Sequence, residues 1–294
     1  MKINHTILAI FVMGIWASNI VAVRIGTEEI TGWTLVTLRM TLMTLILLPF
    51  VPYPRGHIKK IIGLSVTMGT FHFGLMFVAL ERIQAGTAAL IFITSVPFAL
   101  LLALIFFRER LSWRQAGGVL VSFLGVLLLL GEPRINNQSF HVVLALVSAL
   151  SFGAANLQLR SLGGVNVFSI NAWLAAFAVP QMALLSLFLE RGQLDAITTA
   201  RAETWASIVY MGIVVGILGH GLWYLLVPRY TTSQTIPFTL LIPVFGVLFG
   251  IIFLQETLTW LIALGGLITV SGVAIILLRS NESSGKKNFS GREV

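Results

Sequence analysis

The chain has 294 residues, of which 57% are hydrophobic and only 10% are charged. A soluble domain usually carries about 25% charged residues, so this composition excludes a water-facing globule and favours a protein that crosses a membrane several times. Cysteine is absent, which excludes a disulfide framework and a thiolate metal site. The net charge of +8 is explained by basic cytoplasmic loops and does not require a nucleic-acid partner.

Ten runs of the sequence have the length and apolar character of a spanning helix, which needs about 20 mostly apolar residues. In chain order the expected spans are 5–23, 33–52, 59–80, 85–107, 114–131, 141–159, 167–189, 204–227, 231–254 and 260–279. The first run could be a signal peptide. It is long, lacks a small-residue cleavage site before Arg24 and precedes nine more spans, so we expect it to be retained. Residues 280–294 are polar and are expected to form a disordered cytoplasmic tail.

The distribution of Lys and Arg predicts the orientation of these spans. If the N-terminus is cytoplasmic, thirteen basic residues fall in inside segments and five fall in outside segments. Cytoplasmic loops of membrane proteins are enriched in Lys and Arg, so we expect both termini in the cytoplasm and the chain in the cytoplasmic (inner) membrane.

A motif recurs about half a chain apart: "RERLSW" at 108–113 and "QETLTW" at 255–260. A shift of 147 residues aligns further pairs, namely Gly74 with Gly221, Arg82 with Arg229, Glu109 with Glu256, Trp113 with Trp260, Gly118 with Gly265 and Gly125 with Gly272. A smaller shift pairs Asn19 with Asn156. A register shared by several spans indicates an internal repeat.

Each repeat contains five spans, and an odd number sends the second copy through the membrane in the opposite sense. We therefore predict an all-α polytopic membrane protein with ten transmembrane helices in two inverted five-helix repeats. The first repeat is expected at 1–131 and the second at 141–279. Inverted repeats are typical of alternating-access transporters, whose substrate site lies near the midplane between the halves.

Three segments carry a family resemblance. "RERLSWRQAGGVLVSFLGVLLL" resembles the end of the fourth span and the fifth span of the EamA family, within the drug/metabolite transporter superfamily. "GIWASN" and "TLLIPVFGVLFGIIFLQETL" are similar to that family's first and ninth spans, and the resemblance covers residues 5–279. It implies ten helices in two inverted repeats, a central cavity and export of small metabolites, often amino acids or their relatives.

Three basic side chains lie inside expected spans and away from the span ends: Arg39, His72 and His220. A buried Arg is costly in hydrocarbon, so Arg39 either faces a substrate carboxylate or extends to the outer surface near Trp33. A free imidazole titrates near neutral pH, so His72 and His220 are candidates for proton or substrate contact. The alternative is that each bonds to a neighbouring helix.

Polar and aromatic side chains supply the remaining candidates for substrate binding. The amides of Asn19 and Asn156 need partners in hydrocarbon, either across a helix contact or in a cavity. Trp173 is the apparent repeat partner of Arg39. Trp16 and Trp173 lie deep in their spans, and Trp223 lies within about a turn of the cytoplasmic span end, next to Tyr224. These four are candidates to contact a substrate, although core packing explains them equally well.

Prolines interrupt two repeat-related spans: Pro97 in the fourth, and Pro237 and Pro243 in the ninth. Paired breaks of this kind favour a hinge or transport site. Gly117 and Gly118, with Gly265 and Gly266, predict close helix packing, either within each repeat or at a dimer face.

No Asp or Glu lies deep in any span, which argues against exchange of a cationic drug for protons at a membrane-embedded carboxylate. A phosphate-binding GxxxxGK[ST] loop and metal-ligand motifs are also absent, and we expect no cofactor and no enzyme activity. The sequence predicts a secondary transporter that exports small metabolites, with amino acids or their derivatives as the favoured class, as a monomer or weak homodimer. The alternatives are a drug or other metabolite exchanger and a non-transporting receptor or scaffold; the driving force stays open.

Overall fold

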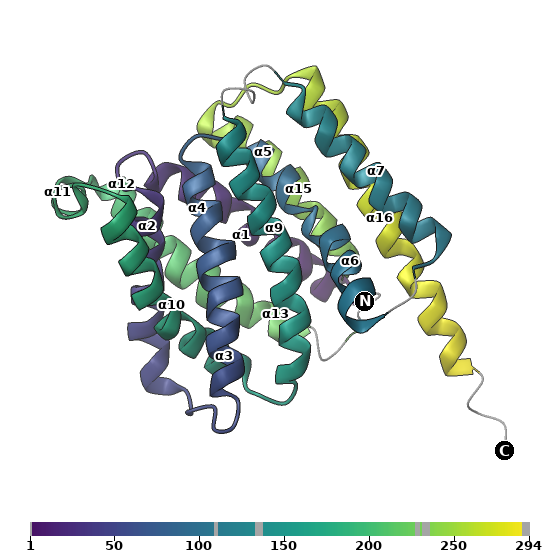
Figure 1. Ribbon diagram of the computed structural model, residues 1–294, viewed down its shortest axis with the longest axis horizontal. Coiled ribbons are helices and arrows are strands. Elements are labelled where there is room, and N and C mark those ends of the chain that lie inside the picture. The colour runs from purple at the N-terminus through teal and green to yellow at the C-terminus, as the bar shows by residue number, and fades with distance from the viewer. Residues whose placement is uncertain (1, 109–110, 133–137, 227–229, 231–235, 290–294) are drawn as a thin grey trace.

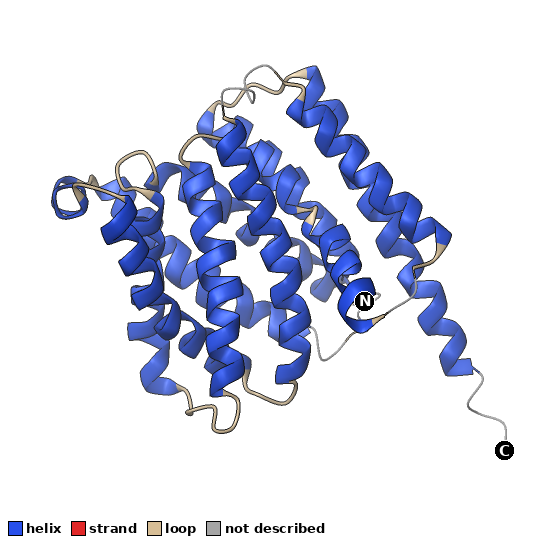
Figure 2. Ribbon diagram, viewed as in Figure 1, coloured by secondary structure: helices blue, strands red, loops and turns tan. Residues whose placement is uncertain are grey.

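The computed structural model describes residues 2–108, 111–132, 138–226, 230 and 236–289. Every regular element in this part of the chain is a helix (Figures 1 and 2). The elements up to residue 132 are α1 (Ile3–Gly26), α2 (Gly32–Leu47), η1 (Leu48–Phe50), α3 (Ile58–Leu64), η2 (Ser65–Gly74), α4 (Leu75–Leu80), α5 (Ala85–Phe92), α6 (Ser95–Phe107) and α7 (Trp113–Leu130).

The elements after residue 138 follow a similar order. They are α9 (Ser139–Leu159), η3 (Arg160–Leu162), α10 (Val167–Leu189), α11 (Gln193–Thr199), α12 (Ala202–Val209), η4 (Tyr210–Gly219), α13 (His220–Leu226), η6 (Ile236–Leu240), α15 (Leu241–Leu254) and α16 (Trp260–Phe289). Helix α16 continues past the expected end of the last span, and the disorder expected for 280–294 stays a prediction.

Nine helices in the described ranges are long and apolar enough to cross a membrane. They correspond to nine of the ten expected spans. The remaining one, expected at 231–254, is represented by a shorter apolar helix, Phe238–Leu254, because residues 231–235 lie outside the described part. Large apolar side chains such as Leu45, Leu120 and Leu187 are exposed around the bundle. Lipid is the environment in which such a surface is stable.

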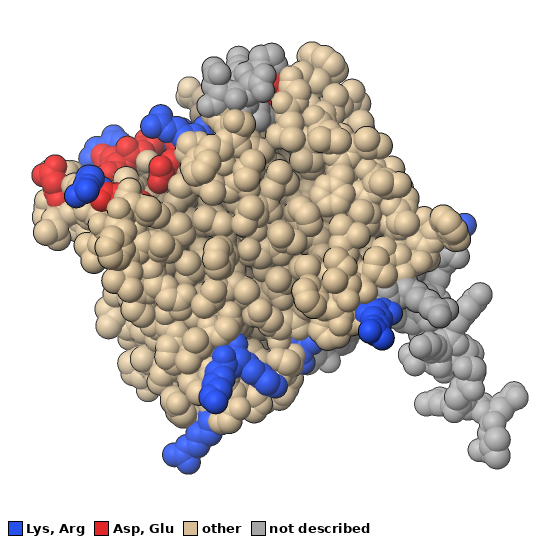
Figure 3. Space-filling model, in the orientation of Figure 1, with Lys and Arg blue, Asp and Glu red and all other residues tan. Residues whose placement is uncertain are grey.

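Charged side chains divide the bundle into two unlike ends (Figure 3). Carboxylates gather at the end formed by segments 27–31, 81–84, 190–203 and 255–259. Glu132 belongs to the same end, because it accepts a hydrogen bond from the Thr259 hydroxyl. We call this the carboxylate-rich end. The opposite end, formed by segments 51–60, 108–114 and 160–166, shows only Lys and Arg among its described charged residues, and we call it the basic end.

Helices α7 and α16 pack closely against each other at the edge of the bundle (Figure 1). A Cβ on Gly118 would lie 2.8 Å from the carbonyl oxygen of Gly272, and a Cβ on Gly125 would lie 2.7 Å from that of Gly265. These glycines therefore join the two halves of the chain. The expectation that these glycines pack within each half or at a dimer face was wrong. They allow close contact between α7 of the first half and α16 of the second half.

Other local features also recur in the second half. Residues Arg108 and Gln255, 147 positions apart, both have positive φ, 52° and 54°, directly after α6 and α15. The π-helices η2 and η4 each span ten residues inside the third and eighth spans. Such wide turns are uncommon and often mark functional sites.

Candidate functional site

Arg39 lies at the middle of α2 and is only 1% exposed, so its side chain does not extend to the surface. Its guanidinium carbon stands 4.7 Å from the ring centre of Phe73 and 5.6 Å from that of Phe77. The Nε and Nη1 atoms are buried and bond to no described residue. Aromatic faces compensate a cation only in part. The arrangement therefore provides a buried positive group with donors available for an anion.

His72 lies beside this cation, on η2, and is buried among aromatic rings. Its Nδ1 is 2.9 Å from Ser148 Oγ and 3.3 Å from the Ser148 carbonyl oxygen. The Ser148 hydroxyl donates its hydrogen to the His72 carbonyl oxygen, so the Ser148 oxygen can only accept from the imidazole. The His72 Nδ1 is therefore the protonated ring nitrogen, and it donates a hydrogen bond to Ser148. His72 is thus bonded to the neighbouring helix α9, which is the structural alternative that the sequence left open.

A second group of candidates meets where α1 packs against α13. The Trp16 ring lies 5.3 Å from the His220 ring and 5.4 Å from the Trp223 ring. His220 Nδ1 donates to the Val215 carbonyl oxygen at 3.1 Å, which the preceding π-helix η4 places within reach. The Trp16 Nε1 atom is buried and bonds to no described residue, so this aromatic group retains one unused donor.

The two groups are neighbours. Met43, one turn after Arg39 on α2, packs where Gly216 leaves room, one turn before His220. The amide oxygen of Asn19, one turn after Trp16 on α1, is also buried without a partner in the described part of the chain. Arg39, Asn19, Trp16 and His220 thus belong to one region inside the bundle.

Other candidates lie elsewhere. Asn156 is exposed and donates to the Phe152 carbonyl oxygen of its own helix. Trp173 donates to the Pro52 carbonyl oxygen at 3.3 Å and packs edge-on against Tyr53, so it holds the 51–57 loop at the basic end. Tyr224 is on α13, but its side chain lies outside the described part. The contacts of Asn156 and Trp173 lie away from Arg39.

The proline-containing spans are interrupted as expected. A turn at 93–94 separates α5 from α6, and Pro97 falls in the first turn of α6, where its missing N–H is not needed. Pro243 occupies the same position in α15, after the short helix η6 that contains Pro237. The side chain of Pro237 is outside the described part. That these breaks act as hinges stays a prediction.

At the carboxylate-rich end, α5 and α15 are in contact. A Cβ on Gly246 of α15 would lie 2.4 Å from the Ala89 Cβ of α5. Both carboxylate oxygens of Glu256 accept backbone N–H groups at the start of α5, from Ala85 and, at 3.0 Å, from Gly86. The second half of the same span, α6, packs on α9 instead. Spans four and nine are therefore joined at the carboxylate-rich end.

Carboxylates cap other helices at this end in the same way. Glu190 accepts from the N–H groups of Trp33 and Thr34, and Glu81 accepts from the N–H of Gly32 at 2.6 Å. Partial burial raises the pKa of Glu81 above its ordinary value. Glu29 accepts from Thr204 and Arg201, and these donors lower its pKa to about 2.

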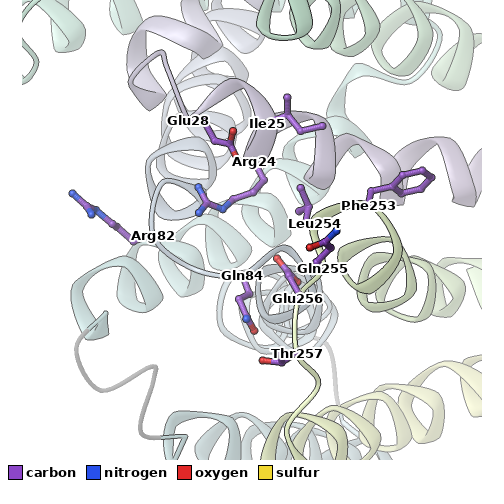
Figure 4. Close-up of a pocket in the computed structure, with 10 residues that line it drawn as sticks. All are labelled: Arg24, Ile25, Glu28, Arg82, Gln84, Phe253, Leu254, Gln255, Glu256 and Thr257. Carbon is purple, nitrogen blue, oxygen red and sulfur yellow. The ribbon is translucent and has the colours of Figure 1, made fainter.

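A cavity of about 520 Å³ opens at the carboxylate-rich end, next to the contact between α5 and α15. Its lining comes from the end of α1, the start of α5 and the end of α15 (Figure 4), and includes Arg24, Glu28, Arg82, Gln84 and Glu256. In the sequence, Arg24 and Arg82 contributed to the predicted orientation, and Arg82 and Glu256 to the repeat, but none of the three was a candidate for a site. The cavity forms only because three segments that are far apart in the sequence lie side by side in the fold, so no local sequence pattern could indicate it.

A sequence profile of the EamA-like transporter family matches residues 5–131 and again residues 139–278. The chain belongs to the EamA-like transporter family. This EamA transporter is 29% identical over 278 residues to a probable amino-acid metabolite efflux pump of Salmonella typhimurium, with 91% of this chain and 93% of that protein covered. A protein of the same description from Escherichia coli is 28% identical over 279 residues, with 92% and 93% covered.

Two further likenesses extend the comparison. A probable terminal-alkyne amino-acid exporter of Streptantibioticus cattleyicolor is 25% identical to this EamA transporter over 292 residues, covering 95% and 96% of the two chains. A protein known by crystal structure superposes with a TM-score of 0.62 at 18% identity, covering 96% and 99%, and shows the shared fold. The EamA protein is thus a multi-pass membrane transporter of a small molecule and not an enzyme, as the sequence predicted.

Proposed function

We propose that this EamA protein exports amino acids or their derivatives from the cytoplasm by alternating access. Its similarity to proteins described as probable amino-acid metabolite efflux pumps and a probable amino-acid exporter supports this substrate class. The observation that carries the proposal is Arg39. A fully buried guanidinium with unused donors has a large free-energy cost in hydrocarbon, and a substrate carboxylate offsets that cost.

The substrate site in this proposal consists of Arg39, Asn19 and the aromatic group around Trp16. Arg39 takes the carboxylate, and the Asn19 amide oxygen accepts from the substrate ammonium group. Trp16, His220 and Trp223 contact the apolar part, and His72 fixes η2 against α9 behind Arg39. Trp173 and Asn156 have structural roles in this proposal, since their hydrogen bonds lie away from Arg39.

The architecture proposed for transport has ten helices in two inverted repeats, residues 1–131 and 141–279, followed by a cytoplasmic tail at 280–294. The two separate family matches support this division. The reciprocal contacts of Gly118 with Gly272 and of Gly125 with Gly265 also support it, because exchanging residues 147 apart turns one contact into the other. Antiparallel α7 and α16 would then be the helices on the approximate two-fold axis.

The proposed orientation places the basic end in the cytoplasm, together with both termini, in the cytoplasmic membrane. The carboxylate-rich end then faces outward, where α5 and α15 meet. In this state the outer path is closed by Glu256, Ala85 and Gly86. Export requires that α15 separate from α5, with the breaks at Pro97 and Pro243 as hinges. A monomer contains the whole site.

The test is counterflow in proteoliposomes loaded with unlabelled amino acid and exposed to a panel of labelled ones. The proposal expects saturable uptake of at least one apolar α-amino acid by wild type. It also expects a loss of about 100-fold or more in Arg39→Gln, with the exposed Arg191→Gln as the matched charge-loss control. Uptake of no amino acid by folded wild type would contradict the proposed class. An imposed pH gradient that drives accumulation would identify proton coupling.

A further inference from the structure

Among the described residues, Arg24, which lines the cavity at the carboxylate-rich end, has no ion-pair partner. Arg24 is partly buried, and its Nη1 donates to the Glu81 carbonyl oxygen at 3.3 Å. Of the carboxylates that line the same cavity, Glu256 is fully engaged, and Glu28 makes only a long, exposed contact with Arg201. Both oxygens of Glu256 accept backbone N–H groups of α5, and Glu28 stands 3.9 Å from Arg201. Within the described ranges, the Arg24 guanidinium therefore has donors left for an added anion.

The polar groups around Arg24 are of the types needed to bind both charges of a zwitterion. In Figure 4 the Arg24 guanidinium lies between Glu28 on one side and Gln84 with Glu256 on the other. Gln84 offers an amide, and Glu28 is a carboxylate that is not ion-paired with Arg24. Arg82 stands at the rim and its side chain extends away from the other lining residues.

Apolar atoms also contribute to the wall. Ile25 from α1 and Leu254 from α15 line the cavity next to these charges. A volume of about 520 Å³ falls in the range of small-molecule sites, which pair an apolar wall with a few polar groups. A cation, an anion and an apolar wall in one cavity match a free α-amino acid with an apolar side chain.

We propose that this cavity is a second, outward-facing binding site for an apolar α-amino acid zwitterion. Arg24 binds the carboxylate, Glu28 binds the ammonium group, and Ile25 with Leu254 contact the side chain. Its role as an exit site rests on the proposed export function: it lies directly beyond the α5–α15 contact, so a solute released outward passes Arg24. Arg82 draws the carboxylate toward the rim.

The test is equilibrium binding of labelled leucine and phenylalanine to the purified full-length protein carrying Arg39→Gln, in which the inner anchor is removed. Saturable binding is expected to remain. Arg24→Gln should then raise Kd by at least tenfold, Glu28→Gln should raise it several-fold, and Arg191→Gln, at the same end but outside the cavity, should leave it unchanged. Isoamylamine and isocaproate, which keep only one of the two charges, should compete at least tenfold more weakly than leucine.

Absence of saturable binding in the Arg39→Gln protein, or equal Kd values for Arg24→Gln and Arg191→Gln, would overturn the second site. If Arg39→Gln does not fold, the stoichiometry of leucine binding is measured instead. Two leucine molecules per chain are expected for the unmodified protein and one for Arg24→Gln. The same number for both proteins would overturn the second site. Failure of the export proposal gives a different result, namely Arg24-dependent binding by a protein that transports no amino acid in proteoliposomes.

Discussion

Gly118 on α7 and Gly272 on α16 approach so closely that a Cβ on either would meet the other's carbonyl oxygen within 2.8 Å. Gly125 and Gly265 repeat this contact, and each of the four glycines has its equivalent 147 residues away. Ser122 and Thr269 lie between the two contacts, and their hydroxyls donate to the carbonyl oxygens of Gly118 and Gly265. The interface is therefore symmetric in detail, with small residues that allow two helix backbones to meet.

Replacing Gly118 by Val should destabilise this interface. The new side chain meets the Gly272 carbonyl oxygen and the Ile276 side chain, and overpacking of this kind typically costs about 1–3 kcal/mol. Gly117→Val is the matched control, because a Cβ at Gly117 meets nothing within 4 Å. Thermal unfolding in detergent should show a lower Tm for Gly118→Val than for Gly117→Val. Equal Tm values would contradict the close contact.

Arg39→Met should separate stability from activity. The substitution keeps an unbranched chain against Phe73 and Phe77 but removes a buried, incompletely paired cation, so the Tm should be equal to or higher than that of wild type. Counterflow of amino acids should fall by about 100-fold or more. A stable Arg39→Met protein that transports normally would show that Arg39 does not bind the substrate.

The fold followed from sequence because hydropathy and charge suffice to locate helices in a membrane. Nine spans and the breaks near Pro97 and Pro243 were predicted to within a few residues. Periodicity does not report which helices touch, so the partners of Gly118 were predicted wrongly. The role of Glu256 in joining α15 to α5 was missed for the same reason: it accepts a hydrogen bond from the N–H of Gly86, which is 170 residues away in the sequence.

The candidate site was predictable in its residue types and less so in its membership. A charge or amide inside a span stands out from sequence, which identified Arg39 and Asn19. Whether a tryptophan faces a site or a loop depends on helix rotation, and a single sequence does not fix that rotation. Trp16 and Trp173 looked alike in sequence, yet one packs on His220 and the other holds Pro52 at the basic end.

Glu81→Gln should stabilise the protein at neutral pH. Burial raises the pKa of this carboxyl, so the stability associated with its protonated form is present below the ordinary value of 4.5 and is lost as pH rises through the higher folded-state value. Glutamine keeps an oxygen to accept from Gly32 and carries no charge. The Tm difference between Glu81→Gln and wild type should grow in favour of the variant from pH 4 to pH 8. A constant or reversed difference would be inconsistent with this cause.

Glu256→Gln should loosen the contact between α5 and α15. The neutral amide retains one acceptor for the two N–H groups of Ala85 and Gly86, and a hydrogen bond to a charged group contributes about 1.5–3 kcal/mol. Thr87→Cys, at a residue only 2% exposed on α5, is a suitable reporter. Its modification by an impermeant thiol reagent should accelerate several-fold with Glu256→Gln.

The control for this measurement is Glu203→Gln, which removes an exposed carboxylate at the same end without touching α5. It should leave the modification rate of Thr87→Cys unchanged. Equal rates for Glu256→Gln and Glu203→Gln would mean that Glu256 does not hold the two helices together.

Two halves that cross the membrane in opposite senses are the central claim, and single cysteines in this cysteine-free chain test it most directly. Arg108 and Gln255 are equivalent positions, both exposed and both with positive φ. In intact cells an impermeant maleimide should label Gln255→Cys, whereas Arg108→Cys should be labelled only after the membrane is permeabilised. Labelling of both from the same side would contradict the inverted arrangement.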